Sequence, residues 1–256
     1  MVTGSEGGLG RALCARLRSA GYRVIGIDRA AVEHPGAGAE TGDAGKGPAC
    51  DVLLELDLAV ATAGEGPLAE LAAPLGEALG SDGVELLVNN AAVQLLGPLD
   101  RLTAEEWNTT FATNLIAPAL LTRLLLPRLE RARGVVIHVG SVHARATKPE
   151  FSAYAASKAA LAGLTRAMAV ELGPRVRVLC VQPAAIETPM LRAGFEGRPE
   201  AFERLAACHP LGRIASLEEI AGTVTLLASP EGASFATGAV IDLDGGVLSC
   251  LHDPDS

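Results

Sequence analysis

Short apolar segments alternate with longer helix-like segments along almost the whole chain. Apolar runs rich in β-branched residues predict strands at 22–28, 52–58, 84–90, 135–141, 176–182 and 239–245. Helical periodicity predicts helices at 9–20, 67–79, 103–131, 152–172 and 216–228. Strand–helix alternation favours a parallel sheet, and near-continuous apolar strands indicate burial on both faces. The sequence therefore predicts an α/β protein with one doubly wound parallel sheet and helices on both faces.

The length of 256 residues suits one large α/β domain covering residues 1–256, and no repeat of fixed period is present. Two segments interrupt the alternation. Residues 31–50 are rich in Gly, Pro and Ala and predict a long loop. Residues 187–212 combine short helical stretches with Gly and Pro, which predicts a lid over a ligand. Residues 247–256 form the tail that follows the last predicted strand.

The net charge limits the binding partners that we expect, and the cysteines indicate the cellular compartment. The formal net charge of −9 argues against nucleic acid or an anionic membrane surface as a main partner. The five cysteines are widely spaced, with no CxxC pair and no His at metal-ligand spacing, so we expect reduced thiols and no metal site. With no charged-then-apolar leader and no apolar run of about 18 residues, we expect a cytoplasmic protein.

The chain opens with a glycine-rich stretch, "TGSEGGLG", directly before an apolar helical pattern. The glycines that form the motif are Gly4, Gly8 and Gly10, and Ser5 and Leu9 lie among the residues between them. Glycine lets backbone approach a pyrophosphate, and a helix N-terminus offers free N–H groups and the positive end of the helix dipole. A tight strand–helix turn also needs glycine for steric reasons alone, so this motif by itself does not establish a dinucleotide site.

A carboxylate stands at the end of the next predicted strand. Asp28 follows Gly10 by eighteen residues, where an acid accepts hydrogen bonds from the adenosine ribose of NAD. The same charge repels the 2′-phosphate of NADP, and Glu6 adds a second negative charge in the turn. Arg29 directly follows Asp28, and its positive charge keeps NADP as the less favoured alternative cofactor. The sequence predicts NAD.

The stretch "YAASK" places Tyr154 and Lys158 four residues apart in a chain with only two tyrosines and three lysines. Residues four apart share one face of a helix. A phenol has a pKa near 10, which is too high for an efficient base at neutral pH, and a neighbouring cation lowers it. The pair is therefore predicted to be an acid/base device, the alternative being two side chains that merely share a solvated helix face.

With four further motifs in order, the sequence resembles the short-chain dehydrogenase/reductase family from Thr3 to about Gly246. The further motifs are "NNAA" at 89–92, Asn114 in "TNL", Ser141 in "VGS", and "PAAIETP" beginning at Pro183. The resemblance implies a Rossmann-type fold and an NAD(P)-dependent ketoreductase. Such an enzyme moves a hydride between a nicotinamide cofactor and a secondary alcohol or ketone.

The resemblance also implies roles for individual residues. Ser141 would orient the substrate oxygen, Asn114 would hold a water in a proton relay behind Lys158, and Lys158 would also bind the nicotinamide ribose. Further cofactor contacts are implied for Asp57 and Leu58 near the adenine, for Asn90 and Ala91 near the ribose, and for Pro183, Ile186 and Thr188 near the nicotinamide. For Asp57 the structural alternative is a cap of the next segment, and for Thr188 the start of the lid helix.

The chain departs from the family pattern at three places. Ala184 and Ala92 each replace a glycine, and we expect shifted backbone rather than lost binding. Only Met1 and Val2 precede Thr3, where the family has about half a strand more. We therefore expect either an upstream start or a shortened central strand with a less firmly held cofactor turn.

Three histidines and the oligomeric state remain open. His143 either lines the substrate pocket or faces solvent, His138 is expected to pack within a strand, and His209 has no identifiable partner. The apolar helices 103–131 and 152–172 favour a homotetramer or homodimer. Two other functions are weighed against the oxidoreductase: a non-catalytic NAD-binding or regulatory protein, and an NAD-dependent epimerase or lyase, which normally needs a longer C-terminal region.

Overall fold

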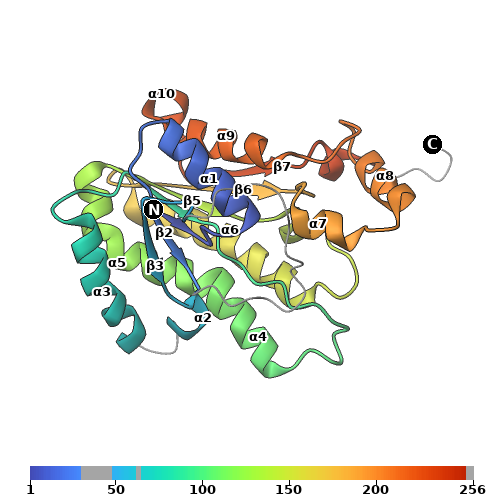
Figure 1. Cartoon of the computed structure of the whole chain (residues 1–256), viewed down its shortest axis with the longest axis horizontal. Helices are drawn as coiled ribbons and strands as arrows, with labels where there is room; N and C mark the ends of the chain where they lie inside the picture. Colours follow the sequence, from blue (N-terminus) through green and yellow to red (C-terminus); the bar gives the residue numbers. More distant parts are fainter. Residues whose placement is uncertain (30–47, 62–64, 252–256) are drawn as a thin grey trace.

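The computed structural model describes residues 1–29, 48–61 and 65–251, so most of the predicted loop at 31–50 lies outside the described residues. Its centre is a seven-stranded, all-parallel sheet in the order β3-β2-β1-β4-β5-β6-β7, which confirms the predicted fold class (Figure 1). The strands are β1 (Val2–Thr3), β2 (Ile25–Asp28), β3 (Val52–Glu55), β4 (Leu86–Asn89), β5 (Val135–Val139), β6 (Arg177–Pro183) and β7 (Val240–Leu243).

Helices cover both faces of this sheet, as Figure 1 shows. One face packs against α3 (Glu65–Leu79), α5 (Ala117–Ala132) and α6 (Ser152–Leu172), and the other against α1 (Gly8–Ser19) and α9 (Leu217–Ala228). The remaining helices are α2 (Leu58–Ala61), α4 (Ala104–Phe111), α7 (Pro189–Gly194), α8 (Pro199–Ala207) and α10 (Pro230–Ala233), with 3-10 turns at Val142–Ala144 and Val247–Ser249. The strand order reverses between β1 and β4, which fixes where a ligand crevice can form.

The segment predicted as one helix at 103–131 is three joined pieces. It begins at Thr103, whose side chain and Glu106 form a reciprocal capping box for α4. A π-helical turn at Ala112–Ile116 separates α4 from α5. The run Ala104–Ala132 is long and apolar enough to cross a membrane by length and composition. Three of its leucines, Leu121, Leu125 and Leu129, are buried in the core against the sheet.

The first strand is shorter than its neighbours and was absent from the predicted strands. β1 has two residues, and Val2 pairs with Gly26 of β2 and with Val88 of β4. The glycine turn after it is nevertheless well bonded, because Gly4 N–H donates to Ile27 O at 2.8 Å. The prediction of a strand reaching residue 58 is wrong at its end, since β3 ends at Glu55 and Leu58 begins α2.

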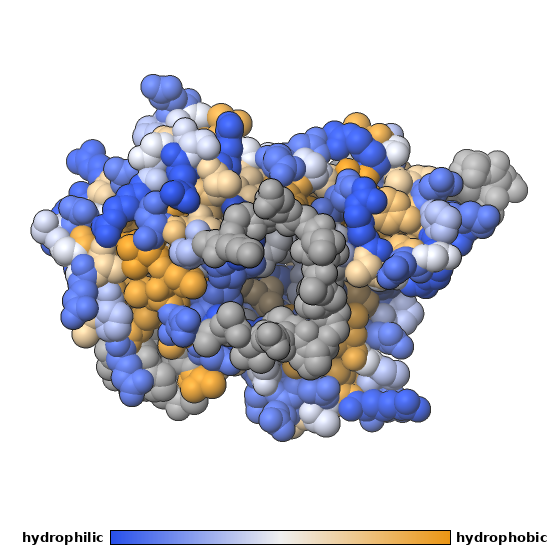
Figure 2. All heavy atoms as spheres, viewed as in Figure 1, coloured by the Kyte–Doolittle hydropathy of each residue, from blue (hydrophilic) through white to orange (hydrophobic). Residues whose placement is uncertain are grey.

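The predicted lid at 187–212 contains two short helices, α7 and α8. Proline starts each of them, and Gly197 with a φ of +69° separates them. No residue of α8 is buried. Figure 2 shows hydrophilic side chains around most of the face seen in Figure 1, with an apolar area beside α3. Within this segment the side chain of His209 is buried, whereas α8 contributes none to the core.

Candidate active site

The glycine turn lies where β1 ends and α1 begins, and its geometry demands glycine. Gly4 has a φ of +64°, a conformation that favours glycine. A Cβ on Gly10 would lie 1.9 Å from Gly4 O, closer than any side chain can approach. Since no side-chain cap closes the N-terminus of α1, its N–H groups face a ligand position at the carboxyl end of the sheet.

A cavity of about 580 Å³ opens in front of this turn at the carboxyl ends of β1, β2 and β4. Most predicted cofactor residues line it: Gly4, Gly8, Leu9, Gly10, Asp28, Asp57, Leu58, Asn90 and Ala91. Ser5 does not, because its side chain is fully buried against Gly26 and Cys50. The turn, helix N-terminus and carboxylate together fit a dinucleotide.

Asp28 is held ready for a polar ligand by two backbone N–H groups. Glu6 N–H donates to its Oδ2 at 2.7 Å, and Arg29 N–H donates to its Oδ1 at 2.8 Å. Asp57 lines the same cavity and also accepts from Ala59 N–H at 2.9 Å, so it caps α2 as the structural alternative supposed. Capping and lining the cavity are compatible, because a carboxylate has several acceptor positions.

Asn90 ties β4 to the glycine turn. Its side-chain amide donates to Thr3 O at 2.9 Å and to Gly4 O at 3.1 Å. Thr3 Oγ1 in turn accepts from the backbone N–H groups of Asn90 and Ala91, both at 3.0 Å. These four bonds connect the glycine turn to the end of β4 although β1 has only two residues.

Tyr154 and Lys158 lie one helical turn apart near the start of α6. Lys158 is buried, and its Nζ donates to Val139 O at the end of β5 at 2.8 Å. Nζ lies 5.6 Å from the centroid of the Tyr154 ring. Burial lowers the pKa of Lys158 to about 8, with Cys180 opposing part of the shift. The chain therefore brings a cation beside the phenol, as the spacing predicted.

The pKa of Tyr154 moves in the direction opposite to the prediction. Burial raises it above 10, and a hydrogen bond with Ser141 offsets part of that rise. The prediction of a net lowering by Lys158 is wrong for this geometry, because desolvation of the phenolate outweighs a cation committed to Val139 O. Tyr154 is thus held in its protonated form, suited to donate a proton.

Ser141 lies directly after β5 with its hydroxyl nearly buried. Its Oγ accepts from His143 N–H at 3.2 Å, and the same hydroxyl hydrogen-bonds the phenol of Tyr154. The two hydroxyls therefore lie within hydrogen-bonding distance of each other, so that one substrate oxygen could accept a hydrogen bond from each.

Asn114 sits in the π-helical turn and is buried. Its Oδ1 accepts from Val93 N–H at 2.9 Å, and its Nδ2 donates to Val93 O at 3.0 Å and to Ser157 Oγ at 3.0 Å. Ser157 Oγ donates to Tyr154 O at 2.7 Å. The amide therefore joins the loop after β4 to the helix that carries Tyr154. The sequence did not single out Val93 or Ser157, since Val93 follows the "NNAA" motif and Ser157 is one of the three unspecified positions between Tyr154 and Lys158.

His143 neither faces open solvent nor stands alone. Its ring stacks on Phe151 at 4.3 Å between centroids and 8° between planes, and it meets Tyr154 edge-on at 5.8 Å. Its Nδ1 lies 2.9 Å from Thr147 Oγ1. Burial and the neighbouring Lys148 lower its pKa, so the ring is neutral. Phe151 was missed by the sequence, although an aromatic residue three positions before Tyr154 is a visible signal.

The other two histidines have structural surroundings. His138 is fully buried in β5, with Nδ1 3.1 Å from Asn89 Nδ2, and burial lowers its pKa to about 3. His209 has Nδ1 3.0 Å from Leu205 O, and its ring packs against Gly245. Neither contacts Tyr154 or Lys158 through a bond found in the described structure.

The predicted nicotinamide-side residues lie beyond β6. Pro183 ends that strand and is buried, and Ile186 bridges to Ala215. Thr188 caps α7 by accepting from Leu191 N–H at 3.0 Å, and a Cβ on Gly8 would lie 3.7 Å from its methyl group. Thr188 therefore starts the lid helix and also borders the glycine turn.

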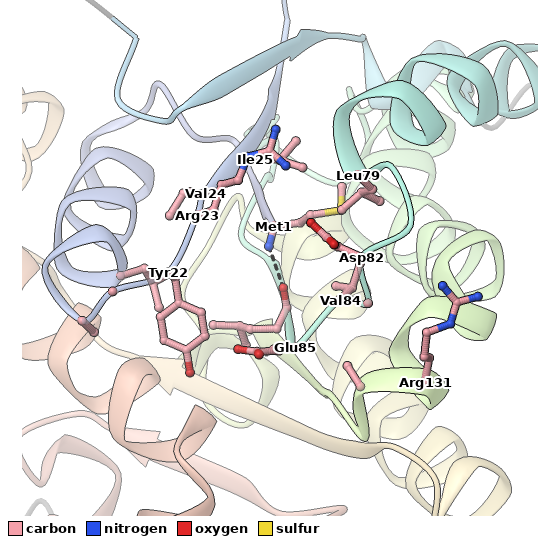
Figure 3. A pocket seen from close by; sticks show the side chains of 16 residues that line it. Met1, Tyr22, Arg23, Val24, Ile25, Leu79, Asp82, Val84, Glu85 and Arg131 are labelled. Carbon is pink, nitrogen blue, oxygen red and sulfur yellow. Dashed lines mark hydrogen bonds between the residues drawn. The ribbon is translucent and has the colours of Figure 1, made fainter.

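A second cavity of about 660 Å³ lies at the amino end of the sheet (Figure 3). Tyr22 and Glu85 stand on one side of it in this view and Arg131 on another. The amino group of Met1 is buried at its edge and donates to Leu86 O at 2.6 Å. None of the predicted site residues lines this cavity. Across residues 1–29, 48–61 and 65–251, no group of three His, Cys, Asp or Glu side chains could hold a metal.

Sequence comparisons relate the chain to known reductases. Residues 4–248 match a family model described as enoyl-(acyl carrier protein) reductase. The chain is 34% identical to L-xylulose reductase of Bos taurus over 97% of this chain and 96% of that protein. It is 36% identical to 3-oxoacyl-(acyl-carrier-protein) reductase of Vibrio cholerae over 96% of each.

Solved structures show the same architecture. A ligand-free aldohexose dehydrogenase of Thermoplasma acidophilum superposes with a TM-score of 0.81 at 27% identity, covering 99% of this chain and 96% of that one. A 3-ketoacyl-(acyl-carrier-protein) reductase of Brucella melitensis in complex with NADH gives 0.77 at 27% identity, covering 96% of each chain.

Proposed function

The chain belongs to the short-chain dehydrogenase/reductase family of nicotinamide-dependent oxidoreductases that act on alcohol and ketone groups, and we propose that Tyr154 is its general acid/base. One observation carries this proposal most directly: Tyr154, Ser141 and Lys158 converge at the carboxyl ends of the strands. The chain acts as one domain over residues 1–256.

In the reducing direction, the Tyr154 hydroxyl gives its proton to the carbonyl oxygen of the substrate. Ser141 donates a hydrogen bond to the same oxygen and orients it. The Lys158 ammonium, 5.6 Å from the ring centroid, reduces the cost of the negative charge left on the phenol, although burial keeps the pKa of Tyr154 above its usual value. The nicotinamide supplies or accepts the hydride when bound. In the oxidising direction the phenolate takes the proton back.

Asn114 affects this chemistry by positioning the helix that carries Tyr154. It links the Val93 backbone to Ser157, and Ser157 contacts the backbone of Tyr154. Asn114 would also hold a water that passes protons between Lys158 and solvent. Both side chains are buried, so a proton leaving Lys158 needs a polar route to solvent.

The preferred cofactor is NAD. The carboxylate of Asp28 lies in the cavity with both oxygens already oriented by backbone N–H groups, where it accepts hydrogen bonds from ribose hydroxyls. A 2′-phosphate at that position meets a like charge. The NADH complex of the Brucella melitensis relative is consistent with this preference.

The functional form is a homotetramer or homodimer in the cytoplasm. Two exposed apolar side chains on the core helices support association: Ile116 beside α5 is 41% exposed and Val170 on α6 is 84% exposed. All five cysteines are free thiols, as a reducing compartment requires. Light scattering at micromolar concentration would contradict the oligomer if it gave a stable monomer of 26.2 kDa.

The experiment for the activity is a panel of ketones and secondary alcohols assayed with NADH, NADPH and their oxidised forms. We expect reduction of at least one ketone, faster with NADH than with NADPH. Tight NADH binding without turnover on any substrate would favour the non-catalytic alternative. Carbon–carbon rearrangement or inversion without net change in cofactor would favour the epimerase or lyase.

A further inference from the structure

Glu6 occupies a position between the ribose-binding carboxylate and a helix cation. It lies in the glycine turn and lines the cofactor cavity. Its backbone N–H donates to Asp28 Oδ2 at 2.7 Å, so its main chain contacts the acid that selects NAD. Its backbone oxygen accepts from Arg11 Nε at 3.1 Å. One residue therefore separates the Asp28 carboxylate from the Arg11 guanidinium.

The side chain of Glu6 holds that guanidinium a second time. Glu6 Oε2 accepts from Arg11 Nη2 in an ion pair, and Glu6 Oε1 accepts from Ala49 N–H at 3.0 Å. The carboxylate is about a quarter exposed and the Arg11 side chain 41% exposed. Arg11 is thus oriented toward Glu6 through two of its donors rather than toward the cavity, whose lining does not include it.

We propose that Glu6 is a specificity-determining residue that withholds the Arg11 guanidinium from the 2′-phosphate of NADP. This inference rests on the proposed dinucleotide function and deepens it. Asp28 excludes the 2′-phosphate by direct repulsion, whereas Glu6 excludes it by keeping the Arg11 guanidinium paired. Cofactor choice then depends on two acids from different elements.

The physical reason lies in what a 2′-phosphate requires. It brings close to two negative charges and is bound best by the planar fork of an arginine. In the wild-type geometry, the fork is engaged by Glu6, and the charges of Glu6 and Arg11 cancel. Removing the Glu6 charge leaves the positive charge of Arg11 unpaired. Arg11 still contacts the backbone of residue 6, whose N–H donates to Asp28. A partly exposed ion pair is weak, so release of Arg11 costs little.

The test compares cofactor binding in matched variants by fluorescence titration with NADH and NADPH. Glu6→Gln keeps the side-chain shape and an oxygen that accepts from Ala49 N–H, while it removes the charge that holds Arg11. We expect the dissociation constant for NADPH to fall about 10-fold and that for NADH to change less than about 3-fold. Adding Arg11→Ala should abolish the gain for NADPH.

Arg11→Ala alone serves as the control: it leaves the Glu6 charge unpaired beside the cavity, so NADPH should gain nothing relative to NADH. An NADPH-to-NADH ratio unchanged in Glu6→Gln would overturn the proposal, as would a gain that persists in the double variant. Wild-type protein that binds neither cofactor would contradict the proposed function itself. A normal NADH titration with no effect of Glu6→Gln would contradict only the role of Glu6.

Discussion

The sheet has a cavity at each end, and the two are nearly equal in size but opposite in chemistry. The carboxyl-end cavity measures about 580 Å³ and the amino-end cavity about 660 Å³. The smaller one contains the glycine turn, Asp28 and Asn90. The larger one, seen in Figure 3, is bordered by side chains such as Tyr22, Glu85 and Arg131. Cavity volume alone would place the cofactor at the amino end of the sheet.

Helix direction explains the difference. The N-terminus of α1 faces the carboxyl-end cavity through Gly8. The amino-end cavity is instead bordered by residues at the C-terminal ends of three helices: Ala20 after α1, Leu79 of α3 and Ala132 of α5. Helix N-termini attract anions and C-termini repel them. A pyrophosphate is therefore favoured at one end of α1 and disfavoured at the other.

The largest expected effect is at the carboxyl end. Tyr154→Phe keeps the ring and removes the proton donor, so turnover should fall by about 10²–10⁴-fold. NADH affinity should barely change, because the hydroxyl is directed at the substrate oxygen. Steady-state kinetics and NADH titration measure the two separately. Near-normal turnover in this variant would contradict the assignment of the proton donor to the carboxyl end of the sheet.

The pH dependence should sharpen the assignment of Lys158. Because its pKa is lowered to about 8, the ammonium loses its proton at a lower pH than a free lysine does. The rate of ketone reduction should fall above pH about 8, by about 10-fold per pH unit at the steepest. Lys158→Arg keeps a cation at all these pH values, so whatever activity remains should lack this decline. A wild-type profile that stays flat to pH 9.5 would contradict the role of the ammonium.

Asp28→Ala should weaken NADH by roughly 10-fold, since one or two charge-assisted hydrogen bonds, each worth about 1.5–3 kcal/mol at most, are lost from a partly solvated position. The same change should improve NADPH relative to NADH, because a like charge is removed. The ratio of the two dissociation constants is the measurement. A wild-type protein that prefers NADPH would refute this account of the cavity.

The smallest effect is expected at the amino end. Tyr22→Phe and Arg131→Ala alter two polar side chains that border the larger cavity. We expect kcat and KM for both cofactor and ketone to remain within about 2-fold, because neither side chain approaches the chemistry. A loss of NADH binding in either variant would assign a function to this end after all.

Much of the fold and part of the carboxyl-end site were predictable from the sequence. Alternating apolar patterns identified the helices well, and 152–172 coincides with α6. Spacing singled out Tyr154 and Lys158, whereas Asn114 and Ser141 came from the resemblance to the family. Strand ends were less accurate, because apolar runs continue into turns. The two-residue β1 carries too little pattern to be seen.

Contacts between distant segments could not be predicted. The clamp of Asn114 on Val93, the stack of His143 on Phe151 and the inward orientation of Ser5 arise only once elements pack together. The sign of the Tyr154 pKa shift also failed. The sequence shows the neighbouring cation but not the burial that outweighs it.

Hydrogen exchange with and without NADH tests the central claim, that ligand chemistry is confined to the carboxyl end, most directly. NADH should slow exchange in the glycine turn at 4–10, at 28–29 and at 90–93, and a substrate analogue should extend the slowing to the lid at 187–212. Exchange at 22–24 and 83–85, beside the larger cavity, should not change. Slowing confined to those amino-end segments, with none in the glycine turn, would contradict the account.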